Sequence, residues 1–386
     1  MKKCVIIYNP ESGRPVDKKN LKELPDIMKV NEYETVMCPT KAAKDATRIV
    51  SELEDDVDLV ICAGGDGTLN EGITGNLMRK NKLVMAQLPV GTMNDVGTMY
   101  GYTKNMIVNA QMLLSGTEKN VDVCMINDVP FVYVACLGSY VDVSYNTPRK
   151  YKKKYGRLAY IFNAIHEFTG KVKLFDLEYE IDGIKKSGIY SFLFITNTSR
   201  MGGISHIYND VKLDDDMFEV LMITAKTKVE LIALATRILA GEVKNMPGLE
   251  YYKTNNLVVR FKDVPNSWVL DGEEYKHNTK EFRFSINKDM YMLVPKKNIV
   301  KLFSNLEEYK EEKPAKRIYQ RLKEVSEVDY IRFELEEKET HIFDSKVGGA
   351  YYVPRDQNLP VNQKTGAPLY LLAQINFEQI PHIKDF

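Results

Sequence analysis

The sequence lacks four features that would indicate other classes of protein. Its five cysteines show no C-x-x-C spacing, which disfavours a disulfide framework or a cysteine-based zinc site. Its 53 basic and 53 acidic residues balance, so the composition gives no reason to expect nucleic acid as a partner. No stretch reaches the roughly 18 uncharged residues of a transmembrane helix. The apolar run at residues 4–8 is too short for a signal peptide. We therefore expect a cytoplasmic protein.

The sequence does contain a glycine-rich run, residues 64–71 (GGDGTLNE), after an apolar segment at 59–63. The segment is continuous and rich in branched residues, which predicts a buried parallel strand. Glycines let the backbone come close to a ligand. Thr68 and Glu71 have the spacing of a capping box, which predicts that the next helix begins there. The N–H groups at such a helix start are suited to binding phosphate.

Asp66 is the unusual residue of this run, because a carboxylate repels phosphate oxygens unless a divalent cation bridges the two. The run therefore predicts a site for a nucleotide with Mg²⁺. An ordinary strand-to-helix turn is the alternative for a single glycine-rich loop.

Two other loops favour the nucleotide site. Residues 9–13 (NPESG) follow an apolar strand at 4–8, and residues 88–95 (LPVGTMND) follow another at 83–87. In an open α/β sheet the loops that follow parallel strands meet at the carboxyl edge, where ligands bind. We expect all three loops to line one crevice.

In this order and spacing, N-P-x-S-G, G-G-D-G-T-x-N-E and L-P-x-G-T-x-N-D resemble the diacylglycerol kinase catalytic family, especially the soluble Gram-positive diacylglycerol kinases. The resemblance continues through short segments over roughly the first 300 residues: 147–148, 156–160, 201–203, 212–215 and 270–273. It implies an ATP- and Mg²⁺-dependent lipid kinase, with diacylglycerol as the leading acceptor and phosphatidic acid as the product.

The resemblance also implies a nucleotide pocket, in which Asp66 meets the Mg²⁺ of the nucleotide. The phosphates would lie against Gly64, Gly65, Gly67 and Thr68. The rest of the pocket is assigned to Asn9, Ser12, Gly13, Arg14, Glu71, Gly91, Thr92 and Asn94. Many bacterial members have lysine where this chain has Arg14, and some have lysine at Asn163. A charge network that joins Arg14 and Asp122 to the second domain is therefore weakened.

Residues 270–273 (LDGE) supply the expected acid–base group. In the resembling family the position of Glu273 is that of the base that takes the proton from the lipid hydroxyl. Asp271 is assigned as a second ligand or an orienting group in the same site. For D-G-E by itself, a solvated β-turn is the alternative.

A second metal site is implied at residues 212–217. In the resembling kinases this loop holds a structural Mg²⁺, which corresponds here to the Asp215 side chain and the carbonyls of Lys212 and Met217. The family usually has glycine where this chain has Asp216, and a positive φ there would strain an aspartate. A solvated acidic turn is the alternative.

The pattern along the chain predicts an α/β protein of two main domains. Strands and helices alternate over residues 1–122, which predicts a three-layer, doubly wound parallel sheet. Residues 123–306 have short strands and tight turns, typical of a β-sandwich. The resemblance to the kinase family implies that the end of this domain, near 298–306, returns to the first domain. The nucleotide would lie in the cleft between the domains. A charged linker is expected over 307–338, and residues 339–386 resemble the beginning of a YwqG-like domain.

A basic run at residues 149–157 has six cations with interleaved tyrosines. A solvated helix entry is the default interpretation. Because the substrate is a lipid, we also consider peripheral contact with the inner face of the membrane, where each basic residue contributes about 1 kcal/mol.

Several alternatives remain open at this point. Other lipid acceptors are phosphatidylglycerol, a sphingoid base or undecaprenol. NAD kinase is a rival enzyme, and a nucleotide- or lipid-binding regulator without turnover is a rival from another class. A homodimer is also left open.

Overall fold

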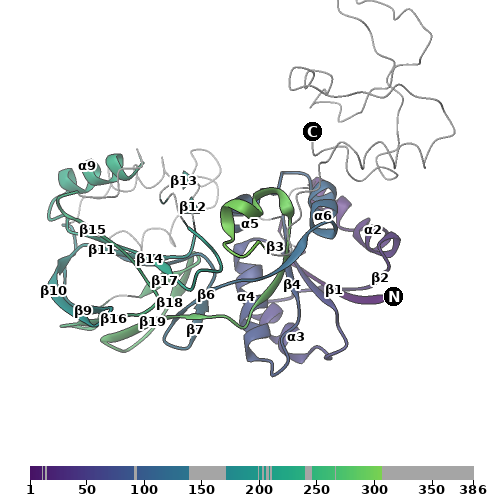
Figure 1. Cartoon of the computed structure of the whole chain (residues 1–386), viewed down its shortest axis with the longest axis horizontal. Helices are drawn as coiled ribbons and strands as arrows, with labels where there is room; N and C mark the ends of the chain where they lie inside the picture. The colour runs from purple at the N-terminus through teal and green to yellow at the C-terminus, as the bar shows by residue number, and fades with distance from the viewer. Residues whose placement is uncertain are drawn as a thin grey trace, which may run out of the picture. The chain divides into compact units, whose positions relative to one another are not determined.

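The structure is a computed structural model in which the chain divides into two units, Met1–Leu306 and Glu307–Phe386 (Figure 1). The described residues are 1–306, apart from 11, 14, 91–93, 139–170, 199, 202–203, 206–207, 209–210, 240–245 and 266. The basic run at 149–157, the charged linker and the YwqG-like fragment lie outside them.

The N-terminal part is built on a sheet of six strands. They are β1 (Lys2–Tyr8), β2 (Tyr33–Pro39), β3 (Leu59–Gly64), β4 (Met85–Pro89), β5 (Thr117–Asn120) and β20 (Tyr291–Val294). Their order is β2-β1-β3-β4-β20-β5. The first four run parallel, so their carboxyl ends lie at one edge. β3 is buried along its whole length, as expected of a central parallel strand.

Helices cover both faces of this sheet (Figure 1). They are α1 (Pro15–Asn20), α2 (Leu24–Val30), α3 (Asp45–Glu52), α4 (Asp66–Met78), α5 (Asp95–Met99) and α6 (Met106–Leu114). Side chains of α2 and α6 pack on one face. On the other face α3 and α4 approach closely, since a Cβ added to Gly75 would lie 2.3 Å from the carbonyl oxygen of Thr47.

The second part is a sandwich of two antiparallel sheets of six strands each. One has the order β10-β9-β16-β19-β6-β7 and the other β15-β14-β11-β8-β17-β18. The strands of the first sheet are β6 (Val123–Ile126), β7 (Val129–Phe131), β9 (Phe175–Ile181), β10 (Ile184–Tyr190), β16 (Leu257–Phe261) and β19 (Glu281–Asn287). Those of the second are β8 (Val134–Gly138), β11 (Phe192–Thr196), β14 (Phe218–Ile223), β15 (Leu249–Thr254), β17 (Trp268–Leu270) and β18 (Glu273–Tyr275).

The core of the sandwich lies between these sheets. Trp268 is fully buried there, with ring centroids 5.3 Å from Phe284 and 5.5 Å from Phe282. Helix α9 (Lys228–Leu239) covers the outer face of the second sheet through Leu231 and Leu234. A small two-stranded sheet pairs β12 (Arg200–Met201) with β13 (Ile204–Ser205).

The chain crosses between the two parts twice. β5 leads into β6, and β19 leads into β20, which lies between β4 and β5 of the first sheet. The return is therefore made by a strand, before the helical turns η1 (Lys296–Asn298) and α10 (Ile299–Leu302). Val121 donates its backbone N–H to the carbonyl of Met290, so the two crossings lie side by side.

The fold class predicted from the sequence is confirmed: a parallel α/β sheet with helices on both faces precedes an antiparallel β-sandwich. Within the described residues, no helix is long and apolar enough to cross a membrane.

Candidate active site

The three predicted loops come together at the carboxyl edge of the parallel sheet. Val90, after β4, donates its backbone N–H to the carbonyl of Gly64 at the end of β3 (3.0 Å). Gly13, after β1, has φ +86°, and a Cβ there would lie 3.2 Å from the carbonyl oxygen of Val90. The loop after β1 therefore lies against the loop after β4, and both adjoin the start of α4. Arg14, Gly91 and Thr92 lie outside the described residues.

Helix α4 begins earlier than predicted. Its N-cap is Gly65 in an extended conformation, and Asp66, Gly67 and Thr68 form its first turn. The predicted capping box of Thr68 and Glu71 is wrong, since no side chain caps this helix. The reason is that the chain turns at Gly65, which needs no side chain to do so. The N–H groups of a first helical turn have no partner within the helix, so this start is suited to bind an anion.

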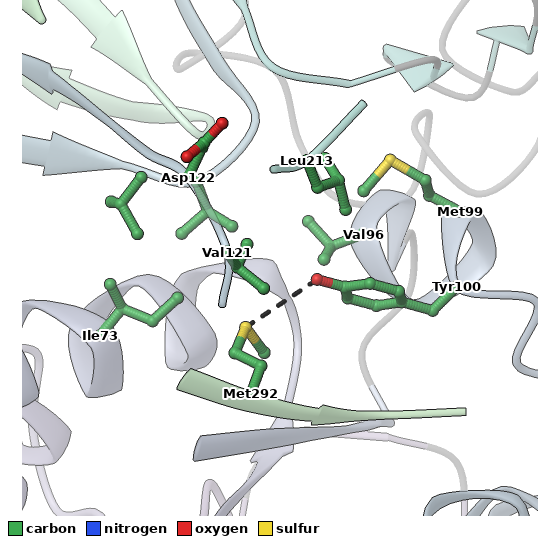
Figure 2. Close-up of a pocket in the computed structure, with 10 residues that line it drawn as sticks. Ile73, Val96, Met99, Tyr100, Val121, Asp122, Leu213 and Met292 are labelled. Atoms are coloured by element: carbon green, nitrogen blue, oxygen red, sulfur yellow. Dashed lines mark hydrogen bonds between the residues drawn. The ribbon is translucent and has the colours of Figure 1, made fainter. Parts of the chain in front are cut away.

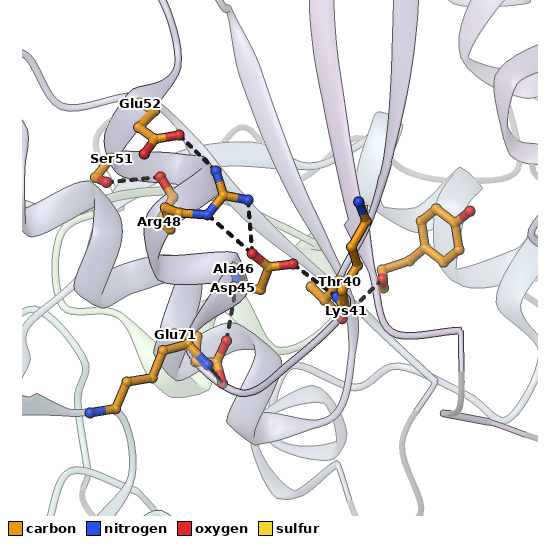
Figure 3. A network of polar contacts seen from close by, with 10 residues as sticks. Thr40, Lys41, Asp45, Ala46, Arg48, Ser51, Glu52 and Glu71 are labelled. Carbon is orange, nitrogen blue, oxygen red and sulfur yellow. Dashed lines mark hydrogen bonds and ion pairs between the residues drawn. The ribbon is translucent and has the colours of Figure 1, made fainter.

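Glu71 has another role in the structure. Its carboxylate accepts hydrogen bonds from the backbone N–H groups of Lys44 (2.8 Å) and Ala46 (3.2 Å), at the start of α3 (Figure 3). Thr47 donates its hydroxyl to the Glu71 carbonyl (2.9 Å). Glu71 therefore holds the loop after β2 against α4. That loop also adjoins β1, because Thr40 donates its backbone N–H to the carbonyl of Tyr8.

Asp66 is buried, at 8% exposure, and its carboxylate faces the start of α5. It accepts hydrogen bonds from the backbone N–H groups of Asp95 (2.9 Å) and Val96 (3.3 Å), and from the amide of Gln87 (3.3 Å). Burial raises the pKa of Asp66 to about 6, and the neighbouring charges of Asp95 and Asp271 contribute in the same direction. Asp66 therefore connects the glycine-rich loop to the segment that follows β4.

The surroundings of Asp66 fit a divalent cation that is shared with a nucleotide. Asp95 and Asp271 add negative charge near Asp66. The buried Gln87 Oε1 has no hydrogen-bond partner among the described residues. Within those residues no group of three His, Cys, Asp or Glu side chains is arranged to hold a metal ion. Mg²⁺ is typically bound by one or two carboxylates together with substrate phosphates. Asp66 would supply the carboxylate.

Asp271 links the sandwich to the first domain. It is 7% exposed and accepts hydrogen bonds from three consecutive backbone N–H groups, at Val132 (2.6 Å), Tyr133 (2.9 Å) and Val134 (3.0 Å). A fourth comes from the side-chain amide of Asn70 in α4 (2.7 Å). Burial raises the pKa of Asp271, and these four donors oppose that rise. The arrangement is that of an orienting group, because its N–H donors come from both domains and tie the turn at Asp271 to α4.

Glu273 lies two residues further along, as the first residue of β18. Asp271 (φ 50°) and Gly272 (φ 95°) form the tight turn between β17 and β18, which places Glu273 opposite Leu270. Positive φ at both central residues is typical of a type I′ hairpin turn. The side chain of Glu273 is exposed, so it is free of the packing that fixes Asp271.

The loop at residues 212–216 joins the sandwich to the end of the described chain. Lys212 donates its ammonium to the carbonyls of Val300 (2.9 Å), Lys301 (3.0 Å) and Phe303 (3.2 Å). Asp214 accepts hydrogen bonds from the backbone N–H groups of Ser304 (2.6 Å) and Asn305 (2.8 Å). Polar contacts from two side chains of the loop thus hold the segment around α10.

Asp216 has φ 61°, in the left-handed region that strains an aspartate. This is the conformation expected at a position where the family usually has glycine. Its backbone N–H donates to Asp122 (2.7 Å), and its carboxylate pairs with Lys288 (2.9 Å). Asp215 pairs with Lys253 through Oδ2 (2.6 Å), whereas its Oδ1 is buried without a hydrogen-bond partner among the described residues. Asp215 Oδ1 is therefore available to bind a hard cation such as Mg²⁺, while Oδ2 of the same carboxylate pairs with Lys253.

A small cavity lies where the two domains meet (Figure 2). It holds about 10 Å³ and is lined mostly by apolar side chains, including Ile73, Tyr100 and Met292, with Asp122 as the single carboxylate. This is room for one water molecule rather than for an acyl chain, which requires a far larger pocket.

The sequence interpretation omitted several residues that the structure brings to the site. Asn70 and Asp95 are within the motifs, but no pattern of neighbouring residues indicated their contacts. Gln87 belongs to an apolar strand, and the loop after β2 has no glycine-rich signature. Glu219 of β14 is 1% exposed, and one of its oxygens lies 3.8 Å from Lys253. A lone glutamate within an apolar run is a signal that could have singled it out.

Comparison with family models finds three matches along the chain. The diacylglycerol kinase catalytic domain matches residues 3–126, and the YegS C-terminal NAD kinase beta sandwich-like domain matches residues 137–285. A domain of unknown function (DUF1963) matches residues 345–386. The three loops belong to the first match, and Asp271 and Glu273 to the second.

Curated relatives and solved structures agree with these models. A diacylglycerol kinase of Bacillus subtilis (strain 168) is 31% identical over 304 residues, 78% of this chain and 99% of that protein. One of Staphylococcus aureus (strain JH9) is 32% identical over 277 residues, 70% of this chain and 86% of that protein. A solved structure of a diacylglycerol kinase from Bacillus anthracis str. Sterne shares the fold, with a TM-score of 0.63 and 21% identity over 77% of this chain and 99% of that one.

The buried carboxylates predict how stability depends on pH. Burial raises the pKa of Glu219 to about 8 from 4.5, and those of Asp66 and Asp122 to about 6 from 3.8. The folded chain therefore binds more protons than the unfolded chain, and its free energy of unfolding should fall as pH rises from about 4 to 8. Glu219→Gln should make the free energy of unfolding fall less steeply between about pH 5 and 8. One carboxyl group can contribute a slope of up to about 1.4 kcal/mol per pH unit.

Urea unfolding at pH 5, 6, 7 and 8, without nucleotide or metal, measures this dependence. Glu54→Gln, at an exposed glutamate, is the matched control and should follow the wild-type curve. A Glu219→Gln curve that runs parallel to the wild-type curve would contradict the prediction.

Proposed function

We propose a reaction for this chain, which belongs to the diacylglycerol kinase family and is a lipid kinase: transfer of the γ-phosphate of ATP, with Mg²⁺, to the hydroxyl of diacylglycerol. The product is phosphatidic acid. The observation that carries the proposal is the Asn70–Asp271 contact, which brings the helix start of the nucleotide loop and the turn bearing Glu273 to one place.

The first domain supplies the nucleotide pocket. The start of α4 faces the phosphates with the N–H groups of its first turn, and the loops with Asn9, Ser12, Gly13 and Asn94 surround it. Asp66 would hold the Mg²⁺ that accompanies the nucleotide. When bound, the cation neutralises the charge that develops on the phosphoryl oxygens.

The second domain supplies the base. Glu273 accepts the proton of the lipid hydroxyl as its oxygen attacks the γ-phosphorus, and the bond from that phosphorus to the bridging oxygen of ADP breaks. Asp271 fixes the turn that carries Glu273. The exposed position of Glu273 leaves it accessible to a hydroxyl group that approaches from a lipid surface.

Diacylglycerol is favoured as the acceptor because the curated relatives in both organisms are named for it. Phosphatidylglycerol, a sphingoid base and undecaprenol are the other candidate acceptors. The acceptor is therefore to be identified by comparing these lipids in the assay below.

Glu273→Gln should lower turnover about 10²- to 10⁴-fold, the usual contribution of a general base. The assay follows labelled phosphate from ATP into mixed micelles of dioleoylglycerol and anionic lipid with Mg²⁺, with products resolved by thin-layer chromatography. Glu274→Gln, one residue further in β18, is the matched control and should stay within about twofold of wild type. Turnover of Glu273→Gln within that range would exclude Glu273 as the base.

The loop at Asp215 is proposed to bind a second Mg²⁺ through the Asp215 side chain and the carbonyls of Lys212 and Met217. Adding Mg²⁺ without nucleotide should then raise the melting temperature, because a cation bound only by the folded state stabilises it. Asp215→Asn should remove this shift, whereas Asp66→Asn should leave it. An equal shift in all three proteins would contradict a site at Asp215.

The basic run at residues 149–157 is proposed as the membrane contact. Wild-type protein should sediment with vesicles that contain anionic lipid, and binding should weaken with salt. Lys152, Lys153 and Lys154 changed together to Glu should abolish binding. Changing Lys18, Lys19 and Lys22 of the first domain to Glu alters the net charge equally and should not. Unchanged binding of the first variant would show that the run is not the contact.

A further inference from the structure

Asn70 lies on α4 one turn beyond Asp66, on the same side of the helix. Its side-chain amide donates to Oδ2 of Asp271 (2.7 Å) and, more weakly, to the carbonyl of Pro130 (3.4 Å). Both acceptors belong to the sandwich. The amide thus uses both of its N–H groups on the other domain, directly behind the turn of α4 that faces the nucleotide.

The partner of Asn70 is itself tightly held. Oδ1 of Asp271 accepts hydrogen bonds from the N–H groups of Tyr133 and Val134, and Oδ2 accepts one from Val132. These N–H groups lie between β7 and the first residue of β8, which is next to β17 in the sheet. Asp271 cannot move without disturbing this segment. A hydrogen bond from α4 to Asp271 is therefore a contact with a rigid part of the second domain.

The same residue sets the position of Glu273. Asp271 and Gly272 form a turn of only two residues, and Leu270 pairs with Glu273 across it. A displacement of Asp271 relative to α4 would carry Glu273 with it. The chain of contacts runs from the phosphate-facing turn of α4, through Asn70, to Asp271 and the base.

We propose that Asn70 is a positioning residue for phosphoryl transfer, which fixes the turn bearing Glu273 at the distance from the nucleotide that the reaction requires. This inference rests on the proposed function. Asn70 touches neither the hydroxyl nor the phosphates in this role, and acts through Asp271. A loss of its amide should lower the rate of the chemical step and leave nucleotide binding intact.

The test uses Asn70→Leu, which keeps the size but removes the donor, and Asn70→Asp, which places a second carboxylate against Asp271. We expect kcat to fall about 10- to 100-fold, as for a misplaced catalytic group, with the KM for ATP within about threefold of wild type. Asn81 gives the matched control, because it also donates its amide to an aspartate, Asp55 (2.6 Å), at the surface of the same domain. Asn81→Leu and Asn81→Asp should retain wild-type kcat.

A second measurement does not depend on turnover. Hydrogen exchange at Val132, Tyr133 and Val134 should accelerate in both Asn70 variants and not in the Asn81 variants, because the Asp271 carboxylate loses one of its anchors. If Asn70→Leu does not fold, Asn70→Ala replaces it, with the melting temperature as the check.

The possible results separate the two proposals. A wild-type protein that phosphorylates no lipid would overturn the proposed function, and exchange at 132–134 would still test the contact. Active wild-type protein with unchanged kcat in both Asn70 variants would overturn the positioning role. A parallel loss of kcat and ATP affinity would also overturn it, since Asn70 would then belong to the nucleotide pocket.

Discussion

The carboxylate of Asp271 is the point on which the arrangement of the candidate site depends. It is nearly inaccessible to water, and burial of such a charge is tolerated only when hydrogen bonds compensate for the lost hydration. Three come from consecutive backbone N–H groups of the sandwich and the fourth from the first domain. One desolvated anion therefore holds the turn beside Glu273, the edge of the sandwich and helix α4 in fixed relation.

Other buried carboxylates are also held by hydrogen bonds or by a nearby cation. Asp66 is held by the N–H groups at the start of α5, and the glycine-rich loop is thereby joined to the segment after β4. Asp122 holds Asp216, and Glu219 lies near Lys253. Burial raises the pKa of Asp66, Asp122 and Glu219, so each holds its proton to higher pH than an exposed carboxyl.

Local patterns predicted much of this molecule because they act over a few residues. The continuous apolar run before Gly64 is buried along its length, and the loops after three parallel strands had to meet at one edge. The turn at Asp271 and Gly272 has the positive φ that an Asp-Gly pair favours. The capping box failed for an equally local reason: Gly65 already turns the chain, so α4 starts at Asp66 and Glu71 is left to hold another loop.

The sequence by itself determined the order of strands and helices, the two-domain architecture and which loops approach the site, since hydrophobic period and turn chemistry are properties of neighbouring residues. Tertiary structure alone decided the partners of each polar side chain. Asn70 and Asp271 are 201 residues apart, and Asp216 lies 94 residues from Asp122. Such contacts depend on how segments far apart in the chain pack together, and a buried carboxylate accepts hydrogen bonds from the N–H groups that this packing places beside it.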